Sequence, residues 1–215
     1  MKVIYHKQSF NITKLPLENI HVIDDWCPLD VWDNFLFKIN RDPRWIYDND
    51  VTYDDGETTE VTWAYRFYRK WKNSYGEQSK HIDPIIDLLL TQFKIEYEQF
   101  DYAGLNGQTE GMQGTIHKDS FRPKNVSFLW HVNKEWNKDW GGAFRVYEFD
   151  TLDKGVRGFN KDIIDKYQIA EIEYKPNRLI IIDGRYPHSA DAPVNCNFNL
   201  RQTLVVRGNI AKCLT

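Results

Sequence analysis

Residues 113–121 read QGTIHKDSF, and this stretch places His117 and Asp119 two positions apart. In an extended segment, side chains two positions apart point to the same face. A second imidazole, His188, stands far downstream within residues 177–193, NRLIIIDGRYPHSADAP. Two histidines and one carboxylate can bind one face of an octahedral Fe(II) ion and leave its other positions open. The sequence therefore predicts a metal site, and we expect these three residues to be its ligands and the catalytic residues.

A candidate anchor for an anion follows the second histidine. Residues 201–206 read RQTLVV, a run that favours a strand with Arg201 and Thr203 on the same face. An arginine fork and a hydroxyl together suit a carboxylate group. We therefore expect Arg201 and Thr203 to bind a carboxylate-bearing cosubstrate.

Each of these residues also has a plainer explanation. His117 and Asp119 could form a local hydrogen bond in a surface turn, His188 could be a structural histidine, and Arg201 could lie on an edge strand. Four such residues in this order, on predicted strands, are much less expected by chance than any one of them. The combined pattern favours a metal site with an anion anchor.

Length and composition indicate an ordinary globular protein. The chain has 215 residues, of which 41% are hydrophobic and 27% charged, enough for one domain with a sizeable core. The net charge of −3 gives no electrostatic reason to expect nucleic acid as a partner. Its three cysteines lie far apart, which favours a reducing compartment, and no apolar run matches a secretory signal or a membrane span. We expect a single cytoplasmic domain over residues 1–215 that binds neither nucleic acid nor a membrane.

The second part of the chain is predicted to be rich in strands. From about residue 95, short segments of β-branched and aromatic residues alternate with turn signals, which is typical of a sandwich or jelly roll. We expect residues 96–210 to form this core and residues 1–95 to form a helical and β support region. The predicted strands are 94–102, 113–117, 125–132, 143–149, 169–174, 178–182, 188–192 and 202–207.

The support region is predicted to contain two amphipathic helices. The first begins near Pro28 and is capped by Asp24 or Asp25, and the second has Pro84 in its first turn. The Asp-rich loop 46–57 is either a lid over the site or a solvated connection. The apolar face of the first helix is expected to include Ile39 and that of the second Phe93, and the predicted strands of this region are 2–5, 20–23 and 58–71.

Four segments resemble the Fe(II)- and 2-oxoglutarate-dependent dioxygenases, and the resemblance is nearest to the prolyl-4-hydroxylase-like branch. The resemblance implies a mainly β (α+β) fold with a double-stranded β-helix (jelly roll, cupin-like) core and buttressing N-terminal helices. The family's Gly-Gly strand entrance resembles Gly141-Gly142 after Trp140. The four segments are 113–121, 127–148 (SFLWHVNKEWNKDWGGAFRVYE), 177–193 and 201–206.

The family's functional residues carry over position by position. Its metal motif, His-x-Asp followed by a distal histidine, matches His117, Asp119 and His188. Its basic 2-oxoglutarate-binding residue matches Arg201, and Thr203 takes the place of the serine in an arginine-x-serine variant. The resemblance therefore implies Fe(II), 2-oxoglutarate and O2 as cofactor and cosubstrates, with ascorbate as an accessory reductant.

One family position departs from the pattern. In this branch a tyrosine two positions before the metal histidine helps to bind 2-oxoglutarate, and Thr115 stands there instead. We expect Tyr102 or Trp130 to supply the missing contact. Because halogenating relatives need a small residue where Asp119 stands, the resemblance implies hydroxylation of an unactivated C–H bond.

Other polar residues receive lesser roles. His131 is expected to be a packed strand residue, and Arg145 and Arg185 are expected to be surface charges. Arg207 falls on the face of Arg201 and is expected at the mouth of the site, and Asp183 is expected to shape the turn before the distal histidine.

The resemblance leaves a peptide or a small molecule as the substrate. Peptidyl proline is our leading hypothesis, with free amino acids and other small molecules as alternatives. A second hypothesis is a cupin-like metal protein, such as an isomerase or a metal-dependent sugar-binding module, that uses the same ligands without 2-oxoglutarate. A third is a noncatalytic β-sandwich that binds a partner through its aromatic residues.

Overall fold

The computed structural model describes residues 1–12, 14–42, 44–49, 62–69, 79–151, 165–197 and 199–213. Its main element is a large mixed sheet formed by β1 (Val3–His6), β2 (Ile20–Ile23), β3 (Ile46–Asn49), β4 (Thr62–Arg69), β5 (Ile95–Gln108), β6 (Asn125–His131), β9 (Leu179–Asp183) and β11 (Arg201–Cys213). The eight strands lie in the order β1-β2-β9-β6-β11-β5-β4-β3. The long strand β11 is therefore central, with β5 and β6 antiparallel on either side of it.

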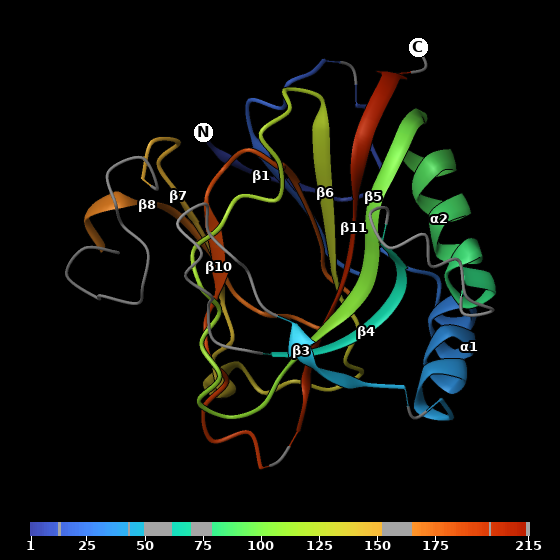
Figure 1. The fold of residues 1–215 in the computed structure, drawn as a ribbon, viewed down its shortest axis with the longest axis vertical. Coiled ribbons are helices and arrows are strands. Elements are labelled where there is room, and N and C mark those ends of the chain that lie inside the picture. Colours follow the sequence, from blue (N-terminus) through green and yellow to red (C-terminus); the bar gives the residue numbers. More distant parts are fainter. Residues whose placement is uncertain are drawn as a thin grey trace.

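The large sheet is covered by helices on one face and by a small sheet on the other. The helices α1 (Leu29–Asn40) and α2 (Ser79–Phe93) lie together at the right of Figure 1. The small sheet has the order β10-β7-β8, with β7 at Phe144–Tyr147, β8 at Gln168–Ile172 and β10 at His188–Ala190. It lies at the left of Figure 1, so the large sheet is the middle of three layers.

Alternation along the central strand separates two cores. Leu204 and Val206 belong to the apolar cluster that includes residues of α1 and α2, whereas Val205 belongs to the cluster shared with β7 and β8. Successive side chains of a strand point to opposite faces, so one strand contributes to both layers. Burial of the α1 residues Trp32 and Phe35, each less than 10% exposed, ties the helices to the sheet.

Most predicted elements are present close to the expected positions. The predicted strand 113–117 is an exception, because this segment forms only an isolated bridge from His117 to His188. The predicted cap of α1 is wrong: Pro28 stands at the N-cap without a side-chain bond, and Asp24 instead accepts from Arg178 (2.6 Å). Pro84 lies beyond the first turn of α2, because that helix begins at Ser79.

Two expectations fall partly outside the described residues. Of the loop 46–57, the part 46–49 is strand β3 and the remainder lies outside the described residues, so the lid stays a hypothesis. Of the predicted strand 58–71, the described part is β4. Neither described helix is long and apolar enough to cross a membrane.

Candidate metal centre

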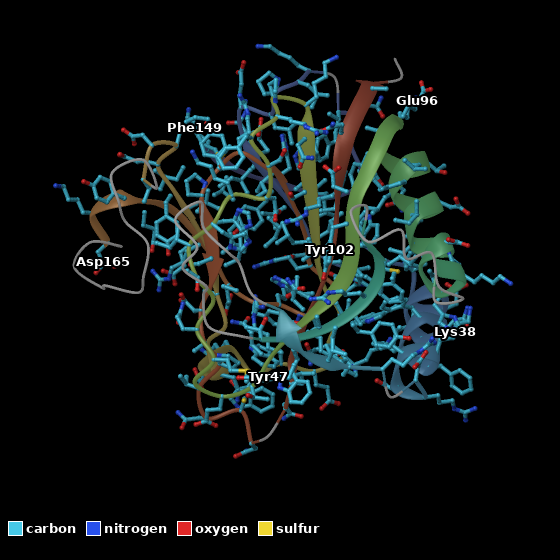
Figure 2. All side chains as sticks on the ribbon, in the orientation of Figure 1. Lys38, Tyr47, Glu96, Tyr102, Phe149 and Asp165 are labelled. Carbon is cyan, nitrogen blue, oxygen red and sulfur yellow. The ribbon has the colours of Figure 1, made fainter. Side chains whose placement is uncertain are left out.

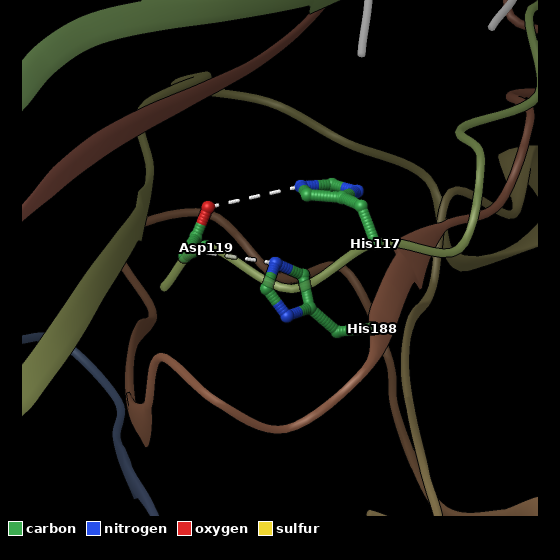
Figure 3. A group of neighbouring side chains, drawn as sticks. All are labelled: His117, Asp119 and His188. Carbon is green, nitrogen blue, oxygen red and sulfur yellow. Dashed lines mark ion pairs between the residues drawn. The ribbon is translucent and has the colours of Figure 1, made fainter. Parts of the chain in front are cut away.

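Three potential metal ligands meet between the two sheets. His117 and Asp119 lie on the extended segment after β5, and His188 begins β10. One ligand atom of each residue lies within 4.8 Å of those of the other two, and Figure 3 shows both imidazoles turned toward the carboxylate. The backbone holds the two histidines side by side, because each main-chain N–H donates to the other's carbonyl at 3.0 and 2.9 Å. The predicted ligand set is therefore brought together.

Each imidazole is oriented by a hydrogen bond on its other nitrogen. Nδ1 of His117 lies 2.9 Å from the carbonyl oxygen of Thr115, and Nδ1 of His188 lies 2.8 Å from that of Tyr186. A carbonyl oxygen can only accept, so Nδ1 carries the proton and the lone pair is on Nε2. The Nε2 atoms lie 3.7 and 3.6 Å from the Asp119 carboxylate oxygens. This second bond, from the ring to a carbonyl, is how metal-binding histidines are commonly fixed.

The protonation states also suit a divalent metal. Loss of hydration on burial lowers the pKa of His117 to about 4, so its ring is neutral at pH 7. Burial alone would raise the pKa of Asp119, but Arg207 and the two histidines outweigh it and hold that pKa below its ordinary value. Metal ligands must be deprotonated, and these two groups are. Two imidazoles and one carboxylate fit Fe(II) as a donor set.

A cationic partner lies directly beside the ligand Asp119. NH1 of Arg207 forms an ion pair with Oδ1, and Ser127 on β6 donates its hydroxyl to Oδ2 at 2.6 Å. The Arg207 guanidinium in turn lies 5.1 Å from the centre of the Tyr102 ring. Arg207 therefore lies directly against a proposed metal ligand and not at the mouth of the site, where it was expected.

Arg201 is buried among neutral partners. Only 2% of it is exposed. Its Nε donates to the carbonyl of Gly142 (2.8 Å), and NH1 donates to Gln108 Oε1 (2.8 Å) and Thr203 Oγ1 (3.1 Å). Within the described part of the chain no carboxylate forms an ion pair with it, and Asp191, which raises its pKa, is itself paired with Arg145 at 2.7 Å.

Because no carboxylate among the described residues forms an ion pair with it, Arg201 is suited to bind an anion. Burial lowers the pKa of Arg201 to about 10, so the guanidinium is still charged at neutral pH. A buried charge without a partner is strongly unfavourable in a finished fold. The Arg201 side chain also lies 4.7 Å from the ring centre of Tyr174. A carboxylate bound here would supply the absent charge.

Gly142 explains the Gly-Gly pair in the sequence. Its φ is +77°, and a Cβ built on it would come within 2.8 Å of Cδ of Arg201. Only glycine accepts both this backbone conformation and this close approach. The pair therefore seats the guanidinium by letting a main-chain carbonyl reach Nε.

The two candidates for the missing cosubstrate contact behave differently. The prediction that Trp130 contacts 2-oxoglutarate is wrong, because its ring packs on the helix side of the large sheet, with 5.4 Å between its ring centre and that of Trp26. Its Nε1 donates to Oδ1 of Asn177 at 3.0 Å. On β6 its neighbours Leu129 and His131 take the opposite face. Tyr102 lies on the inner side of β5 and is labelled near the middle of Figure 2, but it stands opposite Arg207 in the ladder, far along β11 from Arg201. Its predicted contact with 2-oxoglutarate stays a prediction.

The remaining polar residues are packed or ion-paired, and Arg145 and Arg185, which were expected to be surface charges, have only 20% and 21% of their side chains exposed. His131 is buried and stacks on Tyr174 with 4.0 Å between ring centres. Arg185 is paired with Asp183, whose carboxylate also accepts from the Arg185 main-chain N–H (3.0 Å) and so shapes the turn. Arg145 is paired with Asp191, as described above.

Three residues of the site were not found from the sequence. Gln108 meets Arg201 because the two are paired across β5 and β11, and Tyr174 meets it from the end of β8. Ser127 meets Asp119 because β6 lies beside β11. Alternation along β11 was enough to predict that Arg207 lies on the same face as Arg201. Partners on other strands could not be predicted in this way, because they depend on how those strands are aligned with β11.

Two solved structures show which fold this is. A prolyl hydroxylase from Trichoplax adhaerens, solved with a peptide fragment of the hypoxia inducible factor oxygen degradation domain, matches with a TM-score of 0.56 and 12% identity over 88% of this chain and 83% of its own. The fold is that of the prolyl hydroxylases. A prolyl-4-hydroxylase from Pseudomonas putida matches with a TM-score of 0.55 and 15% identity, over 88% of this chain and 92% of its own.

These matches confirm the predicted mainly β fold with a jelly-roll core and supporting helices. No family model and no curated protein sequence matches the chain. At such low identity these matches establish the fold alone. A function has to be inferred from the geometry of the site.

Proposed function

We propose that this protein is an Fe(II)- and 2-oxoglutarate-dependent dioxygenase that hydroxylates an unactivated C–H bond. The observation that carries the proposal is that a cluster of two histidines and a carboxylate shares the inner face with a buried arginine lacking an ion pair among the described residues. The first feature suits Fe(II), and the second suits the carboxylate of a cosubstrate. A metal-binding protein without 2-oxoglutarate would give Arg201 no role.

Each residue would have a defined task. His117, Asp119 and His188 would hold the iron, which when bound supplies the activation of O2 and the oxidation of the C–H bond. Arg201 and Thr203 would bind the distal carboxylate of 2-oxoglutarate, while Gln108 and the Gly142 carbonyl hold the guanidinium in place. The apolar side chains between the sheets would exclude water from the reacting groups.

We propose peptidyl proline as the substrate, within a single domain over residues 1–215 of a cytoplasmic enzyme. The two fold relatives are prolyl hydroxylases, and one of them was solved with a peptide, which supports this choice. Free amino acids and other small molecules are the competing substrates. Ascorbate would serve as an accessory reductant, as in the family that the sequence resembles.

The direct test is formation of succinate from 2-oxoglutarate. The protein would be incubated with Fe(II), 2-oxoglutarate, O2 and ascorbate, and offered proline-containing peptides, free amino acids and other small molecules in parallel. We expect at least one proline peptide to stimulate succinate formation, and Asp119→Ala to form none. Stimulation by small molecules alone would refute the peptide substrate and keep the reaction class. A wild-type protein that neither consumes nor binds 2-oxoglutarate would refute the reaction class.

The cupin-like alternative has its own signature. A calorimetric titration would then show metal binding with no binding of 2-oxoglutarate by the metal-loaded protein. Because Arg201 is buried without an ion pair among the described residues, we expect 2-oxoglutarate to bind.

A further inference from the structure

Arg207 has no part in the family pattern that the sequence resembles, yet it touches a proposed metal ligand. Its NH1 pairs with Oδ1 of Asp119, whose side chain is only 3% exposed. In the described residues Asp119 is the only acid within ion-pair distance of Arg207. The guanidinium therefore neutralises the carboxylate before any metal is bound.

The position of Arg207 is built into the large sheet. Tyr102 stands directly opposite it on β5, and the tyrosine ring lies 5.1 Å below the guanidinium. The ring can lie flat along its strand because Gly104 has no side chain: a Cβ there would come within 2.4 Å of the tyrosine hydroxyl oxygen. That hydroxyl donates to Asn106 Oδ1 at 3.2 Å, which fixes the ring. A ring face under a guanidinium stabilises the cation in place.

The charge of Arg207 should act in opposite directions on the two ligands of the site. The cation repels a divalent metal and competes with it for the Asp119 carboxylate. The same cation attracts 2-oxoglutarate, which carries two negative charges. The charge of Arg207 cancels that of Asp119, so the double charge of the metal is left for the cosubstrate.

We propose that Arg207, held by Tyr102, is a positioning residue that weakens metal binding and strengthens 2-oxoglutarate binding. The inference rests on the proposed function. It also assigns Tyr102 a task beyond the one that the sequence suggested, because the ring supports the arginine.

The test measures both affinities by calorimetry, with Mn(II) as a redox-inactive metal and 2-oxoglutarate titrated into the Mn(II)-loaded protein. For Arg207→Met we expect Mn(II) to bind about tenfold more tightly and 2-oxoglutarate about tenfold more weakly, as loss of one nearby charge implies. Arg207→Lys keeps the charge, so both affinities should stay within about threefold of wild type. Simple structural damage would weaken both.

A matched control and a reserve variant complete the experiment. Arg185 is as exposed as Arg207 (21% and 18% of the side chain) and is also paired with a buried carboxylate, Asp183, but it contacts none of the proposed ligands. Arg185→Met should therefore leave both affinities unchanged. If Arg207→Met fails to fold, Arg207→Gln removes the charge while keeping a donor for Asp119, and it should give the same pair of shifts.

The outcomes separate this inference from the proposed function. A wild-type protein that binds no Mn(II) would overturn both. A wild-type protein that binds Mn(II) and 2-oxoglutarate, with both affinities reduced or both unchanged when the charge of Arg207 is removed, would overturn the role of Arg207 alone. Shifts of opposite sign would establish it.

Discussion

Two buried arginines in this molecule differ in whether a carboxylate balances their charge. Arg178, before β9, is 6% exposed and gives Asp24 two hydrogen bonds, from Nε (2.6 Å) and NH2 (3.0 Å). Arg201, at the start of β11, is 2% exposed and meets only neutral acceptors among the described residues. The first region completes its charge balance within the chain and serves the fold. The second has a charge without a described ionic partner, which the carboxylate of the proposed cosubstrate would balance.

The largest expected effect is on the paired arginine. Arg178→Met leaves the Asp24 carboxylate, 31% of whose side chain is exposed, with Lys175 as its remaining described cationic partner, so we expect a cost of about 3 kcal/mol, the low end for loss of one member of a buried pair. We expect that loss in the free energy of unfolding, measured by urea denaturation of the metal-free protein. A loss below about 1 kcal/mol would remove the basis of the comparison, because Arg178 would then be no more structural than Arg201.

The unpaired arginine should show the opposite pattern. Arg201→Met removes a buried charge that no described carboxylate pairs with, so the free energy of unfolding should be unchanged or slightly higher. The dissociation constant of 2-oxoglutarate for the Mn(II)-loaded protein should rise about 100-fold, or about 2.7 kcal/mol, since a charge-assisted bidentate contact is lost. Mn(II) affinity serves as the internal control and should not change. A large loss of stability with normal 2-oxoglutarate binding would reverse the assignment.

Gly142 offers a way to disturb the unpaired arginine without changing its charge. In Gly142→Ala the new methyl group would meet Cδ of Arg201 in a backbone conformation that alanine avoids. We expect a loss of about 1–2 kcal/mol in stability and about tenfold weaker binding of 2-oxoglutarate. Gly111, which has a positive φ but open space around it, gives the matched variant Gly111→Ala, in which only the stability should fall. Equal 2-oxoglutarate affinity in both variants would show that the seat of Arg201 is adaptable.

The smallest expected effect is the pH dependence of the ion pair between Asp24 and Arg178. Burial would raise the pKa of Asp24, but Arg178 and Lys175 outweigh it and hold that pKa below its ordinary value. A carboxyl with a lowered folded pKa contributes stability above its unfolded pKa and loses it as pH falls through the folded value. Asp24→Asn should therefore cost about 1 kcal/mol at neutral pH, and the difference from wild type should vanish below about pH 3. A difference that stays constant with pH would argue against the ion pair.

The features of the fold and the site that could be predicted from the sequence depend on short-range patterns. The spacing of His117 and Asp119, the parity of Arg201 and Thr203, and the strand texture after residue 95 are all local, and the structure places those residues as expected. The distal histidine was predicted because it completes the donor set, and the resemblance to a known family then matched it to that family's metal motif.

The parts that were missed depend on which strands are neighbours. Gln108 and Ser127 reach the site through pairing of β5 and β6 with β11, and no pattern in their own segments reveals this. Trp130 was assigned to the wrong face of β6: its neighbours Leu129 and His131 face the site, and Trp130 faces the helices. The cap of α1 was misplaced because Asp24 is engaged by Arg178 from a distant part of the chain.

The most direct test of the central claim is an anaerobic titration of the Fe(II)-loaded protein with 2-oxoglutarate, followed by visible absorption. Bound Fe(II) and 2-oxoglutarate together give a weak visible band. We predict a saturable band for wild type, the same band at much higher 2-oxoglutarate concentration for Arg201→Met, and none for Asp119→Ala. No band from the wild-type protein at saturating Fe(II) and 2-oxoglutarate would contradict the assignment of the site.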